Sequence, residues 1–321
     1  MIIGALSHAY FRKGHKIKMK IVILDGITIN PGDLSWHELE SIGDVMVYDR
    51  TTDEELVSRI GDSEVIFTNK CKITGEVMDQ CPNLKFIGVL ATGYDPIDTK
   101  AAKERNIAVA NVPAYSTESV AQHTFALILE LCNNVGIHNE AVQEGAWGRS
   151  NDYCMVIKPI FQLTGKSLGI IGYGNIGKRV GEIAHAFGME VFPYSQEPEK
   201  AMKADIISVH CPATEENKGF INRDFISKMK DGAYLINTAR GALINEVHLA
   251  DALKSGKLAG AALDVVSKEP IDDDSVLLGV PNLLITAHMA FSSKEARAVV
   301  CSTAAANLRA FLAGEMLNRV E

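Results

Sequence analysis

The feature that most constrains this chain is an alternation, from Lys20 onward, of short apolar runs with amphipathic stretches. An apolar run of about four to eight residues that ends in turn or polar residues is typical of a strand buried on both faces. The intervening stretch 51–60 has helical character and begins with Thr51 and Thr52, which favour a helix N-terminus. Strand–helix alternation of this kind predicts parallel sheets with helices on both faces.

The apolar runs form two series, separated by a long apolar helix expected at 119–134. The first series has runs at 20–26, 44–50, 64–70, 84–90 and 107–113, and the second has runs at 167–174, 189–195, 204–212, 232–240, 259–266 and 283–290. An Ala-rich helix is expected from Ser293 to about Ala313. Because single cores stop growing near about 250–300 residues, we predict two doubly wound α/β domains. They span 19–115 plus 291–321 and 116–290, with residues 1–18 as an N-terminal extension.

Charge and cysteine content exclude several classes of protein. The formal net charge of −8 argues against a nucleic-acid or anionic-membrane partner, since both require a basic face. No apolar run reaches the roughly 18–20 residues that a membrane helix needs. The six cysteines are scattered, without a C-x-x-C pair or a His/Cys cluster, so we expect neither a disulfide framework nor a metal site. We therefore expect no nucleic acid, no membrane and no metal, and a cytoplasmic location.

A glycine-rich turn, Gly172-x-Gly174-x-x-Gly177, follows the first apolar run of the second series and opens a helix. In this context Gly172 permits a tight turn, Gly174 lets the backbone approach a pyrophosphate, and Gly177 lets the helix pack close to its strand. The pattern predicts a dinucleotide site.

The end of the next apolar run bears on which dinucleotide is bound. An acidic residue usually holds the ribose 2′-hydroxyl of NAD there, whereas this chain has Ser195. No arginine at 194–198 would receive the 2′-phosphate of NADP, and Glu197 and Glu199 would repel it. The prediction is NAD, with NADP left open.

Several segments together resemble the D-isomer-specific 2-hydroxyacid dehydrogenases over essentially all of residues 19–321. The segments are GYGNIG (172–177), NTARG (237–241), Asp264 to Pro270, TAHMA (286–290), LATGYDPID (90–98) and VPAYSTESVAQHT (112–124). The last two look most like the glycerate dehydrogenase/hydroxypyruvate reductase branch. The resemblance implies an oxidoreductase that moves a hydride between NAD(H) and a small D-2-hydroxy or 2-oxo acid, D-glycerate/hydroxypyruvate or glyoxylate foremost. It also implies a flavodoxin-like substrate domain (19–115 plus 291–321), a Rossmann NAD-binding domain (116–290) and a cleft between them.

Three residues are candidates for the chemistry of this reaction. Reduction of a 2-oxo acid builds negative charge on the carbonyl oxygen, so a cation must lie beside it and a proton must arrive. Arg240 has a planar guanidinium that can grip a carboxylate with two bonds and polarise the ketone. His288 is the expected acid/base, because imidazole titrates near cellular pH. Glu269 is expected to orient the imidazole ring.

The resemblance also implies binding residues. The substrate carboxylate is expected at Arg240 and His288 and at a backbone anion nest formed by Ala91, Thr92 and Gly93. Asp264 is expected to accept a hydrogen bond from the carboxamide of the cofactor. The full set expected around the cofactor is Gly172, Gly174, Asn175, Ile176, Gly177, Ser195, His210, Cys211, Pro212, Thr238, Ala239, Asp264 and Ala290.

Some alternatives stay open. The chain could be a D-lactate-type dehydrogenase for other 2-oxo acids, or an NAD(H)-sensing scaffold that binds partner proteins. A homodimer is expected, and the 119–134 helix is a candidate dimer element, although core packing would also explain its apolar residues. Only residues 196–203 separate Ser195 from the next apolar run, where the family usually fits a further helix and a short strand. The histidines on helix-like stretches, among them His123, His138, His185 and His248, are expected to be structural or exposed.

Overall fold

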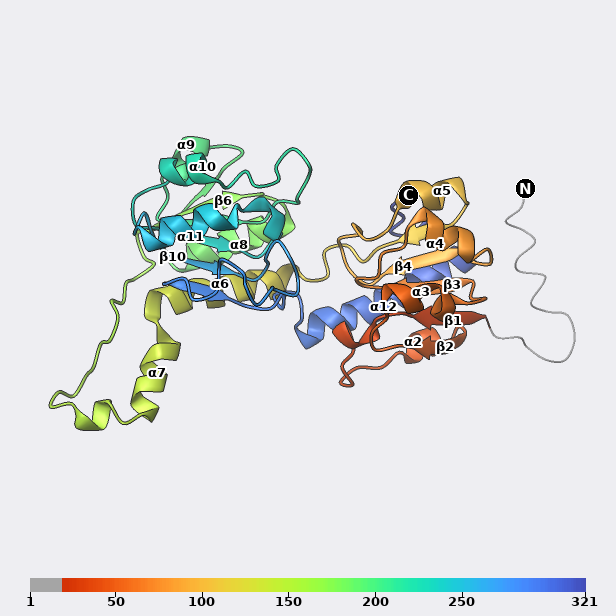
Figure 1. Cartoon of the computed structure of the whole chain (residues 1–321), viewed down its shortest axis with the longest axis horizontal. Coiled ribbons are helices and arrows are strands. Elements are labelled where there is room, and N and C mark those ends of the chain that lie inside the picture. Colours follow the sequence, from red (N-terminus) through yellow and green to blue (C-terminus); the bar gives the residue numbers. More distant parts are fainter. Residues whose placement is uncertain (1–18) are drawn as a thin grey trace, which may run out of the picture. The chain divides into compact units, whose positions relative to one another are not determined.

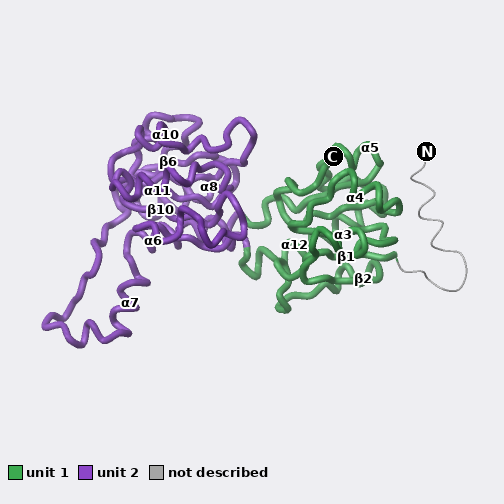
Figure 2. The backbone as a smooth tube through the Cα atoms, viewed as in Figure 1, with its two compact units in different colours: residues 1–116, 292–321 green, residues 117–291 purple. Residues whose placement is uncertain are grey.

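The structure is a computed structural model that describes residues 19–321; the extension predicted at 1–18 lies outside the described residues. The chain forms two compact units (Figure 2). Unit 1 runs to Ser116 and resumes at Ser292–Glu321, and unit 2 is Thr117–Phe291. Each unit contains one parallel sheet with helices packed on it, which confirms the prediction of two doubly wound α/β domains.

Unit 1 has a five-stranded sheet in the order β2-β1-β3-β4-β5 (Figure 1). Every neighbouring pair of strands is parallel. This is the flavodoxin-like order, as predicted for the first domain. The strands are β1 (Lys20–Ile23), β2 (Asp44–Val47), β3 (Val65–Thr68), β4 (Phe86–Val89) and β5 (Ala108–Ala110).

The helices of unit 1 show why the chain folds locally as it does. The expected helix at 51–60 is α3 (Asp53–Ile60), which begins with a capping box between Thr52 and Glu55. The Ala-rich helix is α12 (Lys294–Leu312), which packs against β4 through a ring contact of Phe311 with Phe86. The other helical segments are η2 (Gly26–Thr28), α2 (His37–Glu40), α4 (Gly75–Gln80) and α5 (Thr99–Glu104).

Unit 2 has a six-stranded parallel sheet in the order β11-β10-β9-β8-β6-β7. The strand order reverses at β6, whose neighbours are β7 and β8, so this sheet has the switch point at which doubly wound folds bind ligands. The short segment after Ser195 forms only α9 (Pro198–Met202), and β7 is left at the edge of the sheet. The strands are β6 (Ser167–Ile171), β7 (Glu190–Pro193), β8 (Ile206–Val209), β9 (Ala233–Asn237), β10 (Leu258–Leu263) and β11 (Leu283–Ile285).

The helices of unit 2 are α6 (Thr117–Asn133), α7 (Val135–Gln143), η3 (Trp147–Arg149), α8 (Asn175–Ala186), α10 (Arg223–Lys228), η4 (Gly241–Leu243) and α11 (Glu246–Lys254), besides α9. The expected 119–134 helix is α6, which packs against α8. Its Phe125, Leu127 and Ile128 are buried in the core of unit 2. Core packing therefore accounts for most of the apolar character that made this helix a candidate dimer element.

Residues 134–160, which we call the arm, leave the body of unit 2 and return to it (Figure 1). The arm contains α7 and η3, and α7 buries none of its residues. Its base is closed where the Asn134 side chain donates to the Pro159 carbonyl and the Phe161 N–H donates to the Cys132 carbonyl. The arm thus keeps a defined geometry while its side chains remain on the surface.

Candidate functional site

The predicted site residues of unit 2 follow the carboxyl ends of its parallel strands. Because the strands are parallel, these ends share one edge of the sheet, which we call the carboxyl edge. The strands β11, β10 and β9 lie side by side, so the segments with His288, with Asp264 and Glu269, and with Thr238 to Arg240 leave neighbouring strands. The glycine turn follows β6, Ser195 follows β7, and 210–212 follows β8.

The glycine turn has the backbone that a dinucleotide site needs. Gly172 has φ +94°, and a side chain there would meet the Cys211 backbone nitrogen at 2.4 Å. Gly177 packs so closely that a Cβ would lie 2.1 Å from the Gly172 carbonyl oxygen. Gly174 caps α8 without a side-chain hydrogen bond, and a Cβ there would meet no atom within 4 Å. The first N–H groups of α8, at Asn175, Ile176 and Gly177, thus face an open backbone surface that fits a pyrophosphate.

The end of β7 carries no carboxylate of its own. Ser195 is exposed, and the next acidic side chain, Glu197, is held by an ion pair of 2.5 Å with Lys200. The Lys200 ammonium also lies 5.2 Å from the centre of the Phe192 ring. A hydroxyl and an internally paired glutamate therefore stand where the ribose of a bound dinucleotide is expected.

Arg240 stands in a turn that a buried asparagine shapes. The Asn237 side chain accepts from the Ala239 N–H at 3.0 Å and donates to the Arg240 carbonyl at 2.9 Å. The next position, Gly241, requires glycine because a Cβ there would lie 2.0 Å from the Val266 carbonyl carbon. The Arg240 Nη1 donates to the Ala239 carbonyl at 2.8 Å.

His288 and Glu269 form a hydrogen-bonded pair. The His288 Nδ1 lies 2.5 Å from Glu269 Oε2, and both side chains are partly exposed. The other carboxylate oxygen of Glu269 accepts from the Val266 N–H at 3.2 Å. An ionised carboxylate at Nδ1 makes this nitrogen a donor, so Nε2 is the nitrogen that can exchange a proton with a bound molecule. The structure brings together the two residues that the sequence predicted to act together.

Asp264 is 1% exposed and binds the backbone of the segment that carries His288. Its Oδ1 accepts from the Met289 N–H and its Oδ2 from the Ala290 N–H, each at 2.9 Å. Burial alone would raise the pKa of Asp264, but hydrogen bonds from His123, Thr286 and the same N–H groups hold its pKa below the usual value. The Asp264 carboxylate is therefore ionised and largely committed to the protein; its contact with a cofactor carboxamide stays a prediction.

His210, at the end of β8, belongs to a polar cluster with Thr238. Its Nε2 lies 2.8 Å from Ser208 Oγ, and its Nδ1 lies 3.5 Å from Thr238 Oγ1, which in turn lies 3.1 Å from Thr124 Oγ1. Burial lowers the pKa of His210 to about 3. His210 is therefore neutral, and it orients hydroxyls beside the predicted cofactor residues Cys211 and Pro212.

The predicted substrate loop lies in unit 1, after β4. Thr92 Oγ1 donates to the Val112 carbonyl at 2.8 Å, and the Asn111 side chain donates to the Thr92 carbonyl at 2.7 Å. Within the part of the chain that the structure describes, the N–H groups of Ala91, Thr92 and Gly93 have no acceptor. A turn with fixed carbonyls and open N–H groups is suited to bind an anion.

The sequence interpretation missed residues that support the site from behind. His123 and Thr124 on α6 and Thr286 after β11 all contact predicted site residues or their partners. The available signal was a His-Thr pair inside an apolar helix. His123 proves to be partly buried, with 17% of its side chain exposed.

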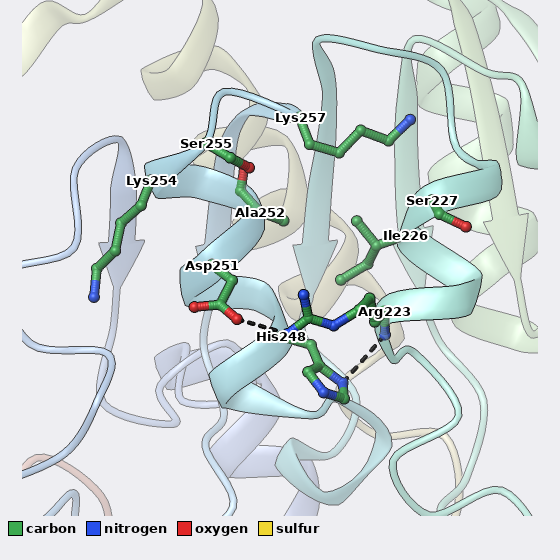
Figure 3. A pocket seen from close by; sticks show the side chains of 9 residues that line it. All are labelled: Arg223, Ile226, Ser227, His248, Asp251, Ala252, Lys254, Ser255 and Lys257. Atoms are coloured by element: carbon green, nitrogen blue, oxygen red, sulfur yellow. Dashed lines mark hydrogen bonds and ion pairs between the residues drawn. The ribbon is translucent and has the colours of Figure 1, made fainter.

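A surface groove of unit 2 lies elsewhere, between α10 and α11 (Figure 3). There the Arg223 N–H donates to His248 Nδ1 at 3.2 Å, and the Arg223 guanidinium donates to Asp251 at 2.8 Å. Lys257 donates to the Met229 carbonyl at 2.8 Å. The groove contains no predicted site residue, and its Arg223 and Asp251 pair with each other.

Among residues 19–321, no three His, Cys, Asp or Glu side chains are grouped so that they could hold a metal ion. In the same range, no helix combines the length and apolar character needed to cross a membrane.

Known proteins resemble this chain in sequence. A family model described as "D-isomer specific 2-hydroxyacid dehydrogenase, NAD binding domain" matches residues 125–290. A hydroxypyruvate reductase of Blautia hydrogenotrophica is 48% identical over 320 residues, which cover 94% of this chain and 99% of that protein. A glycerate dehydrogenase of Methylorubrum extorquens is 36% identical over 313 residues, which cover 94% and 99%.

Solved structures resemble it in fold. The crystal structure of a D-lactate dehydrogenase from Aquifex aeolicus, complexed with NAD and lactic acid, matches with a TM-score of 0.77 and 29% identity. The match covers 92% of this chain and 96% of that one. These findings confirm the resemblance and the predicted cofactor. The chain belongs to the D-isomer-specific 2-hydroxyacid dehydrogenase family and is an NAD-dependent oxidoreductase with a Rossmann domain.

Proposed function

We propose that this enzyme uses NADH to reduce hydroxypyruvate to D-glycerate. We propose glyoxylate as its second substrate. The observation that carries the proposal is the 2.5 Å pair of His288 with Glu269, on the same sheet edge as Arg240 and the glycine turn. The names of the two relatives, hydroxypyruvate reductase and glycerate dehydrogenase, support this substrate.

The proton step follows from the pair. In the reductive direction His288 is protonated, and its Nε2–H donates to the ketone oxygen as the C–O double bond becomes a hydroxyl. Glu269 accepts from Nδ1–H, which stabilises the imidazolium and fixes the ring. In the oxidative direction neutral Nε2 takes the hydroxyl proton back.

Arg240 supplies the charge that the ketone needs. Its guanidinium stabilises the negative charge that develops on the carbonyl oxygen, and its planar fork suits a carboxylate, which it can bind with two bonds. In unit 1, the N–H groups of Ala91, Thr92 and Gly93 are a separate set of donors that suits a carboxylate. Neither role requires a change of protonation, because the guanidinium is always charged.

The cofactor residues serve binding and orientation. When bound, NADH supplies the hydride for the reduction. Gly172, Gly174, Asn175, Ile176 and Gly177 would hold its pyrophosphate at the start of α8. Ser195, His210, Cys211 and Pro212 would contact the adenosine side, and Thr238, Ala239, Asp264 and Ala290 the nicotinamide side.

A substrate panel tests the proposal. We expect NADH oxidation, followed at 340 nm, to be fastest with hydroxypyruvate, slower with glyoxylate, and slowest with pyruvate and phenylpyruvate. Faster turnover of pyruvate would favour a D-lactate-type enzyme. Absence of turnover with every 2-oxo acid, combined with NADH-dependent capture of a protein, would favour the scaffold hypothesis.

We further propose a homodimer in which the arm of one subunit contacts the second subunit. Large apolar side chains are exposed along the arm: Val135, Trp147, Tyr153, Val156, Ile157 and Ile160. An apolar surface of this kind needs a cover, and symmetric pairing of identical chains is the commonest way to provide one. We expect a dimer in sedimentation experiments and a shift to monomer for Trp147→Asp combined with Ile157→Asp. A monomeric wild type would contradict the proposal.

We also propose that the enzyme works in the cytoplasm. All six cysteines are free thiols, which suits a reducing compartment. Fractionation of cells that express the protein at its natural level tests this.

A further inference from the structure

A chain of hydrogen bonds links helix α6 to the segment that carries His288. His123 on α6 places its Nε2 3.0 Å from Thr286 Oγ1 and 3.4 Å from Asp264 Oδ1. Thr286 Oγ1 lies 2.6 Å from the same carboxylate oxygen. All three residues belong to unit 2. Helix α6 contributes no predicted catalytic or cofactor residue, so this contact has no role in the function proposed so far.

The direction of these bonds follows from proton counting. The Thr286 hydroxyl has one proton, and the ionised Asp264 carboxylate can only accept, so the hydroxyl donates to Asp264. Its oxygen must then accept the bond from His123, which makes His123 Nε2 a donor. The same nitrogen also lies 3.4 Å from Asp264 Oδ1, where its N–H faces a negative charge. His123 therefore acts as a donor to both members of the Thr286–Asp264 pair.

The Asp264 carboxylate in turn shapes the backbone around His288. The His288 N–H donates to the Asp264 carbonyl, and the next two N–H groups, of Met289 and Ala290, donate to its two carboxylate oxygens. Successive N–H groups that converge on one anion form a nest. His288 has φ +49°, a left-handed conformation that is strained for a residue with a side chain and persists only where the surroundings enforce it.

We propose that His123 is a positioning residue that acts on His288 through Thr286 and Asp264. By donating to this pair, His123 fixes the carboxylate that holds residues 288–290 in their nest. The nest keeps His288 Nδ1 against Glu269 and leaves Nε2 for the proton. The proposal rests on the proposed function of His288 as acid/base. It adds a role for His123, which itself exchanges no proton with the substrate.

A matched pair of variants tests the proposal. In His123→Gln the amide nitrogen takes the place of Nε2 and keeps a donor, whereas in His123→Asn it takes the place of Nδ1 and ends short of Thr286. We expect Asn to lower kcat with hydroxypyruvate about tenfold, with KM for NADH changed less than twofold, and Gln to restore most of kcat. His185→Asn, at an exposed histidine on α8, is the control and should leave kcat unchanged.

A double mutant tests the route. Because Thr286→Val interrupts the hydrogen-bonded part of the same chain, His123→Asn combined with Thr286→Val should lose less kcat than the product of the two single losses. Losses that multiply would overturn the proposed route. A kcat for His123→Asn within twofold of wild type, or equal losses in the Asn and Gln variants, would overturn the role of His123.

A spectroscopic measurement separates this proposal from the proposed function. In 1H–15N spectra of the unliganded protein, we expect His123→Asn to shift or broaden the imidazole signals of His288, and Gln to restore them. Unchanged His288 signals in His123→Asn would overturn the proposal even where turnover is measurable. A wild type that reduces no 2-oxo acid would instead overturn the proposed function, while the spectra still report on the position of His288.

Discussion

Each of the two units uses one buried aspartate to clamp a loop at the carboxyl end of its sheet. In unit 1, Asp25 follows β1 and accepts from the N–H groups of Asn69 and Lys70, which follow the neighbouring strand β3. In unit 2, Asp264 follows β10 and accepts from Met289 and Ala290, which come after the neighbouring strand β11. The side chains are 6% and 1% exposed.

The two clamps differ in what surrounds the carboxylate. The segment clamped by Asp25 is tied further by a neutral bond, from the Asn69 amide to Thr28. Asp264 instead receives a hydroxyl and lies within 3.4 Å of an imidazole, and its loop carries a histidine in a left-handed conformation. From this difference we expect the same structural device to serve stability in unit 1 and, where it is linked to a titratable residue, to position His288 in unit 2.

The largest expected effect concerns the residue that each clamped loop carries. His288→Ala removes the proton donor, so we expect kcat with hydroxypyruvate to fall about 10³-fold. Lys70→Ala, in the loop clamped by Asp25, should lower kcat less than tenfold. Steady-state kinetics with NADH measure both. A comparable loss in the two variants would mean that the clamps do not differ in function.

The clamps themselves should separate activity from stability. Asp264→Asn and Asp25→Asn each leave a buried N–H facing an amide, so both should lower the free energy of unfolding by about 2 kcal/mol. Only Asp264→Asn should lower kcat strongly, about 100-fold, because only that loop holds His288. Urea unfolding and initial rates measure the two effects. An equal loss of kcat in Asp25→Asn and Asp264→Asn would contradict the functional difference between the two clamps.

The stability of unit 2 should also depend on pH, through His210. The folded protein holds His210 neutral with a pKa of about 3, whereas the unfolded chain protonates it near its ordinary value of 6.5. Its contribution to stability is thus complete above about pH 6.5 and declines as the pH falls towards 3. The loss should approach about 1 kcal/mol per pH unit, below the full 1.4 because part of the residue meets solvent. The urea midpoints of unfolding at pH 6.5 and pH 4.5 should differ less in His210→Gln than in the wild type. An equal difference in the two proteins would contradict this.

The smallest expected effect lies outside both clamps, at the end of β7. Glu197 is exposed enough to meet a 2′-phosphate but is paired with Lys200. Glu197→Gln should free Lys200 and raise kcat/KM for NADPH about threefold to tenfold, with NADH changed less than twofold. Lys200→Gln is the matched control and should not gain activity with NADPH. A gain in both variants would exclude the ion pair as its cause.

Local sequence signals predicted the fold well because they are themselves physical requirements. Each apolar run named as a strand overlaps one strand, and the 51–60, 119–134 and 293–313 helices begin and end within two residues of α3, α6 and α12. The glycine turn could be predicted because close contacts with neighbouring backbone atoms require glycine at Gly172 and Gly177. The segments with Arg240, Glu269 and His288 were identified because three specific patterns occurred together.

The role of α6 and the surroundings of Asp264 could not be predicted from local sequence signals. The apolar residues of α6 fit a dimer surface or a core equally well, and only the packing on α8 decided for the core. His123 looked like an ordinary helical histidine, because the residues it contacts lie more than a hundred positions away along the chain.

The sequence by itself thus determined the two parallel sheets and the dinucleotide turn and named the candidate reacting side chains, since these depend on local periodicity, glycine geometry and residue chemistry. Only the tertiary structure decided that Asp264 clamps the segment around His288 and that His123 reaches it. Those hydrogen bonds depend on the relative placement of α6, β10 and β11. Such placement is set by the packing of the whole unit, which no short stretch of chain encodes.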